Sequence, residues 1–270
     1  MAGCGGAPPP RAQPRPTYLS AELPELIARA NAWTAAALRA RGQLRMYWSG
    51  DEDSRHVDIN LFASRSGALV LQGRRSLAGT IFNLISDGLD FQLVVPDHAA
   101  HYRGTSTAAV EPDPERPYFA LRPHHITEAL LPEPLPAANA PGSYVSRQTY
   151  PDLYSLVWVQ SDNDDVRVRR KVWVRRDTLQ VSQIEGFDGD GRIAFVASYS
   201  DYPGRGRDAY PRTIEVERPW EELTFRFDLT EAERNPVIPD AAFRFQELPG
   251  GYRALTIEQA MAEFRAKGGG

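Results

Sequence analysis

The chain has 270 residues, of which 42% are hydrophobic, and a formal net charge of −4. That length holds one large domain or two small ones, and the apolar share is sufficient for a real core. The negative charge balance gives no overall basic field for nucleic acid, and no apolar stretch is long enough for a membrane-spanning helix.

The only cysteine of the chain, Cys4, directly follows Ala2 and Gly3. Ala-Gly-Cys resembles the end of a bacterial lipobox, so we expect Cys4 to be the lipidation site and a signal peptide to lie upstream of Met1. Two glycines and five prolines within residues 5–16 predict a disordered tether over 1–17. The alternative is that Cys4 is a chance cysteine in a flexible tail.

The first half predicts helices that interrupt an antiparallel meander. Apolar residues with helical spacing indicate a helix over 18–41, which Gly42 ends, and a second short helix over 76–87. Alternation of polar and apolar residues predicts strands with one apolar face. These strands are expected at 43–49, 55–63, 67–73, 90–95 and 98–103.

The second half predicts an insertion followed by strand after strand. Residues 105–151 contain nine prolines and enclose one expected helix around 118–131, and insertions of this length are functional or disordered. Thr256-x-x-Gln259 is a capping box that predicts a closing helix. The later strands are expected at 154–160, 166–174, 178–187, 192–200, 210–217 and 221–229.

The expected fold is α+β and mostly antiparallel: a curled, open half-barrel of about eleven strands with helices covering its concave face. A sheet of this width must curl because each strand pair adds twist. The inward side chains either line a hydrophobic ligand cavity or form ordinary core, since both give the same pattern. They are Trp33, Met46, Trp48, Ile59, Leu71, Phe91, Trp158, Phe195 and Phe225.

Arg170 interrupts the otherwise apolar inward face of strand 166–174. A buried charge is costly unless it is paired, so Arg170 is the candidate contact for an anionic headgroup; the alternative is a solvent-exposed strand edge.

No motif of the chain indicates catalysis or metal binding. The five histidines do not converge on a zinc-type site, and Asp188-Gly189-Asp190-Gly191 lacks the complete calcium-loop pattern. We therefore expect no catalytic residue, no metal and no cofactor.

Four segments resemble the LolA/LolB superfamily of periplasmic lipoprotein carriers. They are Leu38-Arg39-Ala40-Arg41-Gly42-Gln43-Leu44-Arg45, residues 76–84 running into 90–96, His101-Tyr102-Arg103-Gly104, and Phe243-Arg244-Phe245 with Pro249-Gly250-Gly251. Together they span most of residues 20–250, although the insertion at 105–151 is longer than the family pattern.

The resemblance implies an unclosed barrel that binds acyl chains beneath a helical lid, in a single domain over 18–267. It implies an outer-membrane lipoprotein facing the periplasm, which sorts or transfers lipid or lipoprotein acyl chains and is not an enzyme. The expected partners are the membrane, through the N-terminal lipid, the acyl chain itself and other envelope proteins, but no nucleic acid. The alternative is a structural or protein-interaction envelope lipoprotein whose barrel is filled by its own helices.

Overall fold

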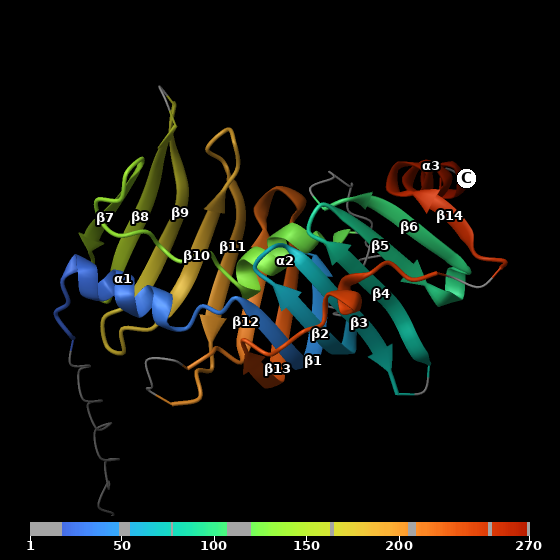
Figure 1. The fold of residues 1–270 in the computed structure, drawn as a ribbon, viewed down its shortest axis with the longest axis horizontal. Coiled ribbons are helices and arrows are strands. Elements are labelled where there is room, and N and C mark those ends of the chain that lie inside the picture. The colour runs from blue at the N-terminus through green and yellow to red at the C-terminus, as the bar shows by residue number, and fades with distance from the viewer. Residues whose placement is uncertain are drawn as a thin grey trace, which may run out of the picture.

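The computed structural model describes residues 18–48, 55–76, 78–106, 120–162, 165–204, 209–247 and 250–268 (Figure 1). Cys4, with the predicted tether at 1–17, and residues 107–119 of the predicted insertion lie outside the described residues.

The described strands fall into two consecutive series and one late addition. The first series is β1 (Ala37–Trp48), β2 (Arg55–Ser64), β3 (Ala68–Arg75), β4 (Gly79–Asp87), β5 (Asp90–Val95) and β6 (Ala100–Thr105). The second is β7 (Ser143–Thr149), β8 (Leu153–Asp162), β9 (Asp165–Arg175), β10 (Val181–Phe187), β11 (Ile193–Ser200), β12 (Thr213–Arg218) and β13 (Leu223–Arg234). The late strand is β14 (Arg253–Thr256).

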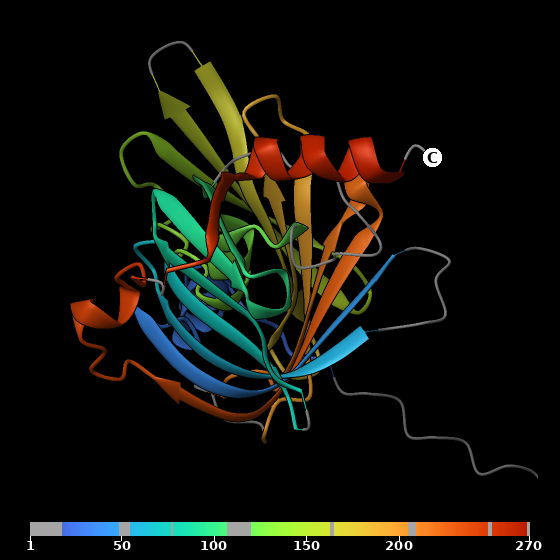
Figure 2. The ribbon, with the colours of Figure 1, turned by 90° about the vertical axis from the view of Figure 1, so that its right-hand side faces the viewer.

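All fourteen strands belong to one sheet, in the order β14-β6-β5-β4-β3-β2-β1-β13-β12-β11-β10-β9-β8-β7. The central pair β1–β13 is antiparallel, whereas β14 runs parallel to β6 at one edge. The sheet curls strongly and remains open between its edge strands (Figure 2). This architecture confirms the expected open half-barrel.

Two short helices cover the concave face of the sheet (Figure 1). Helix α1 (Leu23–Ala32) packs against β9, and α2 (Pro123–Leu130) packs against β2, β3 and β12. A third helix, α3 (Ile257–Gly268), follows β14 and contacts β6 (Figure 2). The 3₁₀ turns are η1 (Pro96–His98), η3 (Pro219–Glu221) and η4 (Asp240–Phe243).

The predicted helix over 76–87 is wrong, because this segment forms strand β4. Phe82 and Leu84 belong to the core on the concave side, while Ile85 is buried on the other side, where η4 packs on β3 and β4. Because β4 is buried on both faces, its apolar residues do not alternate strictly with polar ones, and Ile81, Leu84 and Ile85 also fit a helical spacing.

The predicted helix over 18–41 is too long, and the described residues form fourteen strands rather than about eleven. Helix α1 ends at Ala32, and the alanine-rich residues that follow enter β1, where pairing with β2 and β13 outweighs helix propensity. Strands β4, β7 and β14 are the three additions. In β7, Val145 is the one buried residue, so the strand has no apolar alternation to reveal it.

Candidate functional site

The concave face holds the side chains predicted to line a ligand cavity. Eight of them are at most 6% exposed and belong to one continuous core. They are Trp33, Met46, Ile59, Leu71, Phe91, Trp158, Phe195 and Phe225. The side chain of Trp48 lies outside the described part of the structure. Strands of both series thus form one apolar surface, and α1 and α2 lie on it.

Two buried tyrosines hold the C-terminal end of α2 to the sheet. The hydroxyl of Tyr199 donates a hydrogen bond to the Ala129 carbonyl at 2.9 Å, and that of Tyr210 donates to the Leu130 carbonyl at 2.7 Å. Both rings also contact Trp33, with centroid distances of 4.9 and 5.7 Å. Burial raises the pKa of both tyrosines, so both hydroxyls keep the proton that they donate.

Arg170 points into the concave face and is only 3% exposed, so it does not lie at a solvent-exposed strand edge. Its Nη1 donates to the Glu133 carbonyl at 2.6 Å, and its Nη2 lies 3.2 Å from Oε1 of Glu128 on α2. Its guanidinium also lies 5.9 Å from the Trp158 ring centroid. The buried charge of Arg170 is therefore paired with Glu128 on the covering helix α2 and with the Glu133 carbonyl just after this helix.

A second buried polar group lies at the N-terminal end of α2. Arg218 donates to the Ala120 carbonyl at 2.6 Å and forms an ion pair with Glu221, which also binds Arg122 at 3.2 Å. Burial, followed by the repulsion of Arg122, lowers the pKa of Arg218 to about 10. Both ends of the α2 segment are thus held through backbone carbonyls.

Sequence reasoning missed Tyr199, Tyr210 and Arg218. Tyr199 and Tyr210 interrupt the apolar side of a predicted strand with a polar group, the same signal that identified Arg170. Arg218 lies one residue beyond the predicted strand 210–217 and is the last residue of β12. A polar side chain at an inward position needs a buried partner, and in this fold the partners are buried backbone carbonyls at the two ends of the α2 segment.

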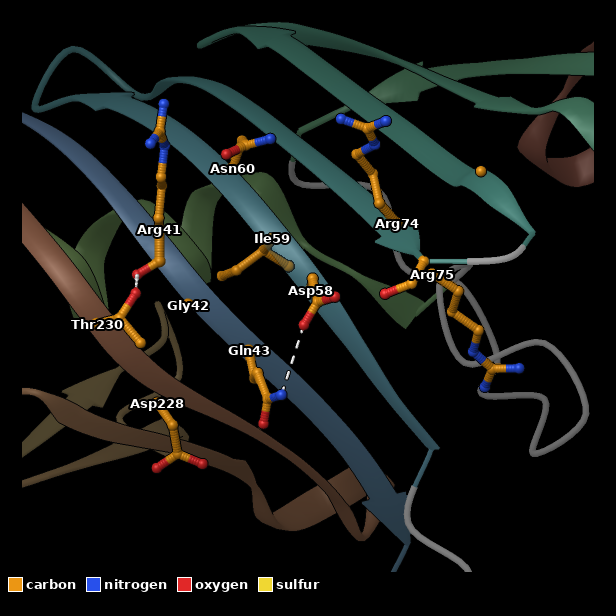
Figure 3. Close-up of a pocket in the computed structure, with 12 residues that line it drawn as sticks. Arg41, Gly42, Gln43, Asp58, Ile59, Asn60, Arg74, Arg75, Asp228 and Thr230 are labelled. Carbon is orange, nitrogen blue, oxygen red and sulfur yellow. Dashed lines mark hydrogen bonds between the residues drawn. The ribbon is translucent and has the colours of Figure 1, made fainter.

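A hollow with a volume of about 530 Å³ lies on the opposite, convex face of the sheet (Figure 3). Strands β13, β1, β2 and β3 and the β3–β4 turn line it. Its polar lining residues are Arg41, Gln43, Asp58, Asn60, Arg74, Arg75, Ser76, Asp228 and Thr230.

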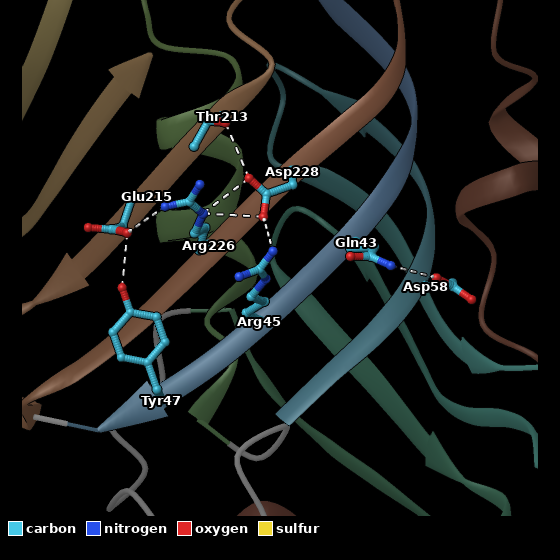
Figure 4. Close-up of polar contacts among 8 residues, drawn as sticks. All are labelled: Gln43, Arg45, Tyr47, Asp58, Thr213, Glu215, Arg226 and Asp228. Carbon is cyan, nitrogen blue, oxygen red and sulfur yellow. Dashed lines mark hydrogen bonds and ion pairs between the residues drawn. The ribbon is translucent and has the colours of Figure 1, made fainter. Parts of the chain in front are cut away.

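A polar network runs along one side of this hollow (Figure 4). Asp228 accepts from Nε of Arg226 at 3.1 Å and from Thr213 at 3.2 Å, and lies 3.3 Å from Nη2 of Arg45. Tyr47 donates to Glu215 at 2.9 Å, and burial raises the pKa of Tyr47 to about 12. Asp228 is thus fully engaged by its own neighbours.

Two further findings concern the residues that the structure describes. Among them, no three side chains of His, Cys, Asp or Glu are grouped so that they could hold a metal ion. None of the described helices combines the length and the apolar character needed to cross a bilayer.

No protein-family model and no curated protein matches the chain. Among solved structures, it is similar to a LolA superfamily protein from Nitrosomonas europaea, with a TM-score of 0.51 and 10% identity over 84% of this chain and 99% of that one. A DUF1329 family protein from Desulfovibrio piger gives a TM-score of 0.48 and 14% identity over 82% and 95%. A putative outer membrane lipoprotein-sorting protein domain from Vibrio parahaemolyticus gives 0.43 and 12% over 81% and 93%. The first similarity shows the LolA-like fold, as the sequence resemblance implies.

Proposed function

We propose that the protein is a lipid-anchored envelope carrier that holds the acyl chain of a lipid or lipoprotein non-covalently, for sorting or transfer at the outer membrane. The observation that carries this proposal is the attachment of α2, which the sheet holds through side-chain contacts to backbone carbonyls. A cover held in this way can lift while the strand pairing stays intact. An acyl chain entering beneath it gains about 0.8 kcal/mol per buried CH₂.

Arg170 gives the proposal its headgroup chemistry. When α2 lifts, Arg170 loses both the Glu128 carboxylate and the Glu133 carbonyl. A guanidinium left alone in an apolar concavity is costly, and an anionic headgroup would replace the lost partners. The proposed ligand is therefore an amphiphile with an acyl chain and an anionic group.

Lipidation at Cys4 is the proposed anchor, and it places the single domain at 18–267 on the periplasmic side of the outer membrane. The support is the Ala2-Gly3-Cys4 sequence and the proline-rich residues that follow it. When it is expressed behind a signal peptide, the Cys4→Ser protein should leave the membrane fraction. Retention of Cys4→Ser in that fraction would contradict the anchor.

The tight packing of the concave face favours a second candidate, an interaction lipoprotein without a ligand. The eight described cavity side chains are already buried against the sheet and its helices. In that case the barrel is filled by its own chain, and α2 never leaves it.

One experiment separates the two candidates. Lipid extraction and mass spectrometry of the purified protein should detect bound lipid, and an apolar fluorescent probe should be taken up and displaced by amphiphiles. Arg170→Met should reduce the affinity ratio between an anionic and a neutral amphiphile of the same chain length by about tenfold. The neighbouring Arg169→Met, on the exposed face of the same strand, should keep it. If no bound lipid is found and no probe is taken up, the carrier proposal fails and the self-filled barrel is the candidate that remains.

A further inference from the structure

The hollow on the convex face is built by two irregularities of the sheet, one on each side. Between β1 and β13 the register shifts at Arg41 and Gly42, which leaves Thr230 without a paired residue. Between β3 and β4 it shifts at Gly73 and Arg74. Such β-bulges bend a strand and re-aim its side chains, and they are frequent next to functional sites.

Each bulge places an arginine at the hollow. Arg41 and Arg74 extend to the same side, and Asn60 lies between them on the intervening strand β2 (Figure 3). Gly42 makes this possible, because a Cβ at that position would lie 2.1 Å from the Asp228 carbonyl oxygen. Two guanidinium groups and a side-chain amide therefore border one space, a donor set that suits an oxyanion.

The charges of these arginines are weakly compensated. Arg41 has an ion pair with Glu231 at 3.7 Å, with both side chains about two-thirds exposed, so this pair contributes little. Asp228 is engaged by Arg226, Arg45 and Thr213 (Figure 4).

Asp58 adds a negative group to the other end of the same hollow. It is the cross-strand partner of Arg74, yet the two form no ion pair among the described contacts, and Asp58 turns instead toward Gln43 at 3.4 Å (Figure 3). Asp58 and Asn60 are two residues apart on one strand. The negative group of Asp58 is therefore about 7 Å from the oxyanion-binding groups around Asn60.

From this arrangement we infer that the convex hollow binds a small zwitterion: its phosphate lies between Arg41 and Arg74 on Asn60, and its ammonium group faces Asp58. Phosphoethanolamine has this chemistry, either as a free compound or as a lipid headgroup. The site lies on the face opposite α2, so it is independent of acyl-chain binding in the concave face.

The test is calorimetric titration of the full chain carrying Cys4→Ser with phosphoethanolamine, inorganic phosphate and phosphocholine. Phosphoethanolamine should bind saturably and at least about fivefold more tightly than the other two, because only its ammonium group donates to Asp58. Arg74→Gln should weaken binding about tenfold, and Asp58→Asn should reduce phosphoethanolamine affinity to that of phosphate. Arg169→Gln, a matched exposed arginine on β9 of the same convex face, should have no effect.

Vesicles separate the two sources of this chemistry. If the protein is retained on phosphatidylethanolamine vesicles but not on phosphatidylcholine vesicles, and this retention depends on Arg74, the ligand is a lipid headgroup. If only the free compound binds, the ligand is a soluble zwitterion. The inference is overturned if phosphoethanolamine shows no saturable binding, if phosphate binds equally well, or if Arg169→Gln weakens binding as much as Arg74→Gln. Because none of the titrated compounds has an acyl chain, these outcomes do not depend on the carrier function.

Discussion

At two places in the sheet, a phenylalanine ring fills the space that a side chain on the opposite strand would need. Phe195 lies across from Gly186, and Phe82 across from Gly73. A Cβ on Gly186 would lie 2.2 Å from Cε1 of Phe195, whose ring is fully buried and has no room to move. Gly186→Ala should therefore destabilise the protein by about 1–3 kcal/mol, measured as a lower urea midpoint.

The control for this substitution is Gly250→Ala, because a Cβ on Gly250 would meet no atom within 4 Å. It should leave the urea midpoint nearly unchanged, and adding Phe195→Leu to Gly186→Ala should recover part of the loss. An unchanged midpoint for Gly186→Ala itself would show that this close packing is not present.

Partly buried His125 should make the stability of the folded protein depend on pH. Burial, with the nearby charges of Arg218 and then His124 and Arg122, lowers the pKa of its imidazole from 6.5 to about 3. Between these pH values the unfolded chain binds a proton that the folded protein does not. The contribution of the neutral imidazole to the free energy of unfolding is therefore complete above pH 6.5 and is lost as the pH falls toward 3. The loss approaches about 1.4 kcal/mol per pH unit.

The measurement is the free energy of unfolding at pH 6.5 and at pH 4.5. The decrease between them should be about 2 kcal/mol smaller in His125→Gln than in the unchanged protein. His124→Gln is the control, since that side chain is about half exposed. Equal decreases in all three proteins would contradict a His125 that stays neutral in the folded protein.

At the scale of elements, the sequence predicts the strands that have one apolar and one polar face. Strand β5 occurs at the predicted residues, and β2 and β11 deviate by about one residue. Strand β4 could not be recognised, because the cover on its convex side comes from η4, more than 150 residues later. The hydrogen bonds that hold α2 to the rest of the fold could not be predicted either, because their acceptors are backbone carbonyls, which every residue type has.

The capping box of α3 is a local feature, and both of its hydrogen bonds are present. The Thr256 N–H donates to Oε1 of Gln259 at 2.9 Å, and the Gln259 N–H donates to Oγ1 of Thr256 at 3.2 Å. Thr256→Ala should cost about 1 kcal/mol of helix stability, seen as faster amide hydrogen exchange in the first turn of α3. Exchange in α1 should not change, and unaltered exchange in α3 would contradict the cap.

At the scale of the whole molecule, two runs of six consecutive strands follow the same direction across the sheet. Strands β1–β6 run from the centre to one edge, and β8–β13 run from near the other edge back to the centre. Each series ends in a hairpin with a proline-initiated 3₁₀ turn, followed by a residue of left-handed φ, Ala99 or Glu222. The glycine–phenylalanine pairs also occupy corresponding strands, β3–β4 and β10–β11.

Despite this similarity, neither series should fold alone. The central strand β1 pairs with β13, and α2, which precedes the second series, packs on β2 and β3 of the first. A fragment of residues 18–106 would leave β1 as an exposed edge and uncover the concave apolar face. We expect this fragment to show no cooperative unfolding, and the full chain to unfold in one transition with equal urea midpoints by tryptophan fluorescence and far-ultraviolet circular dichroism. Two separate midpoints, or a cooperatively folded fragment, would show instead that the two strand series are independent domains.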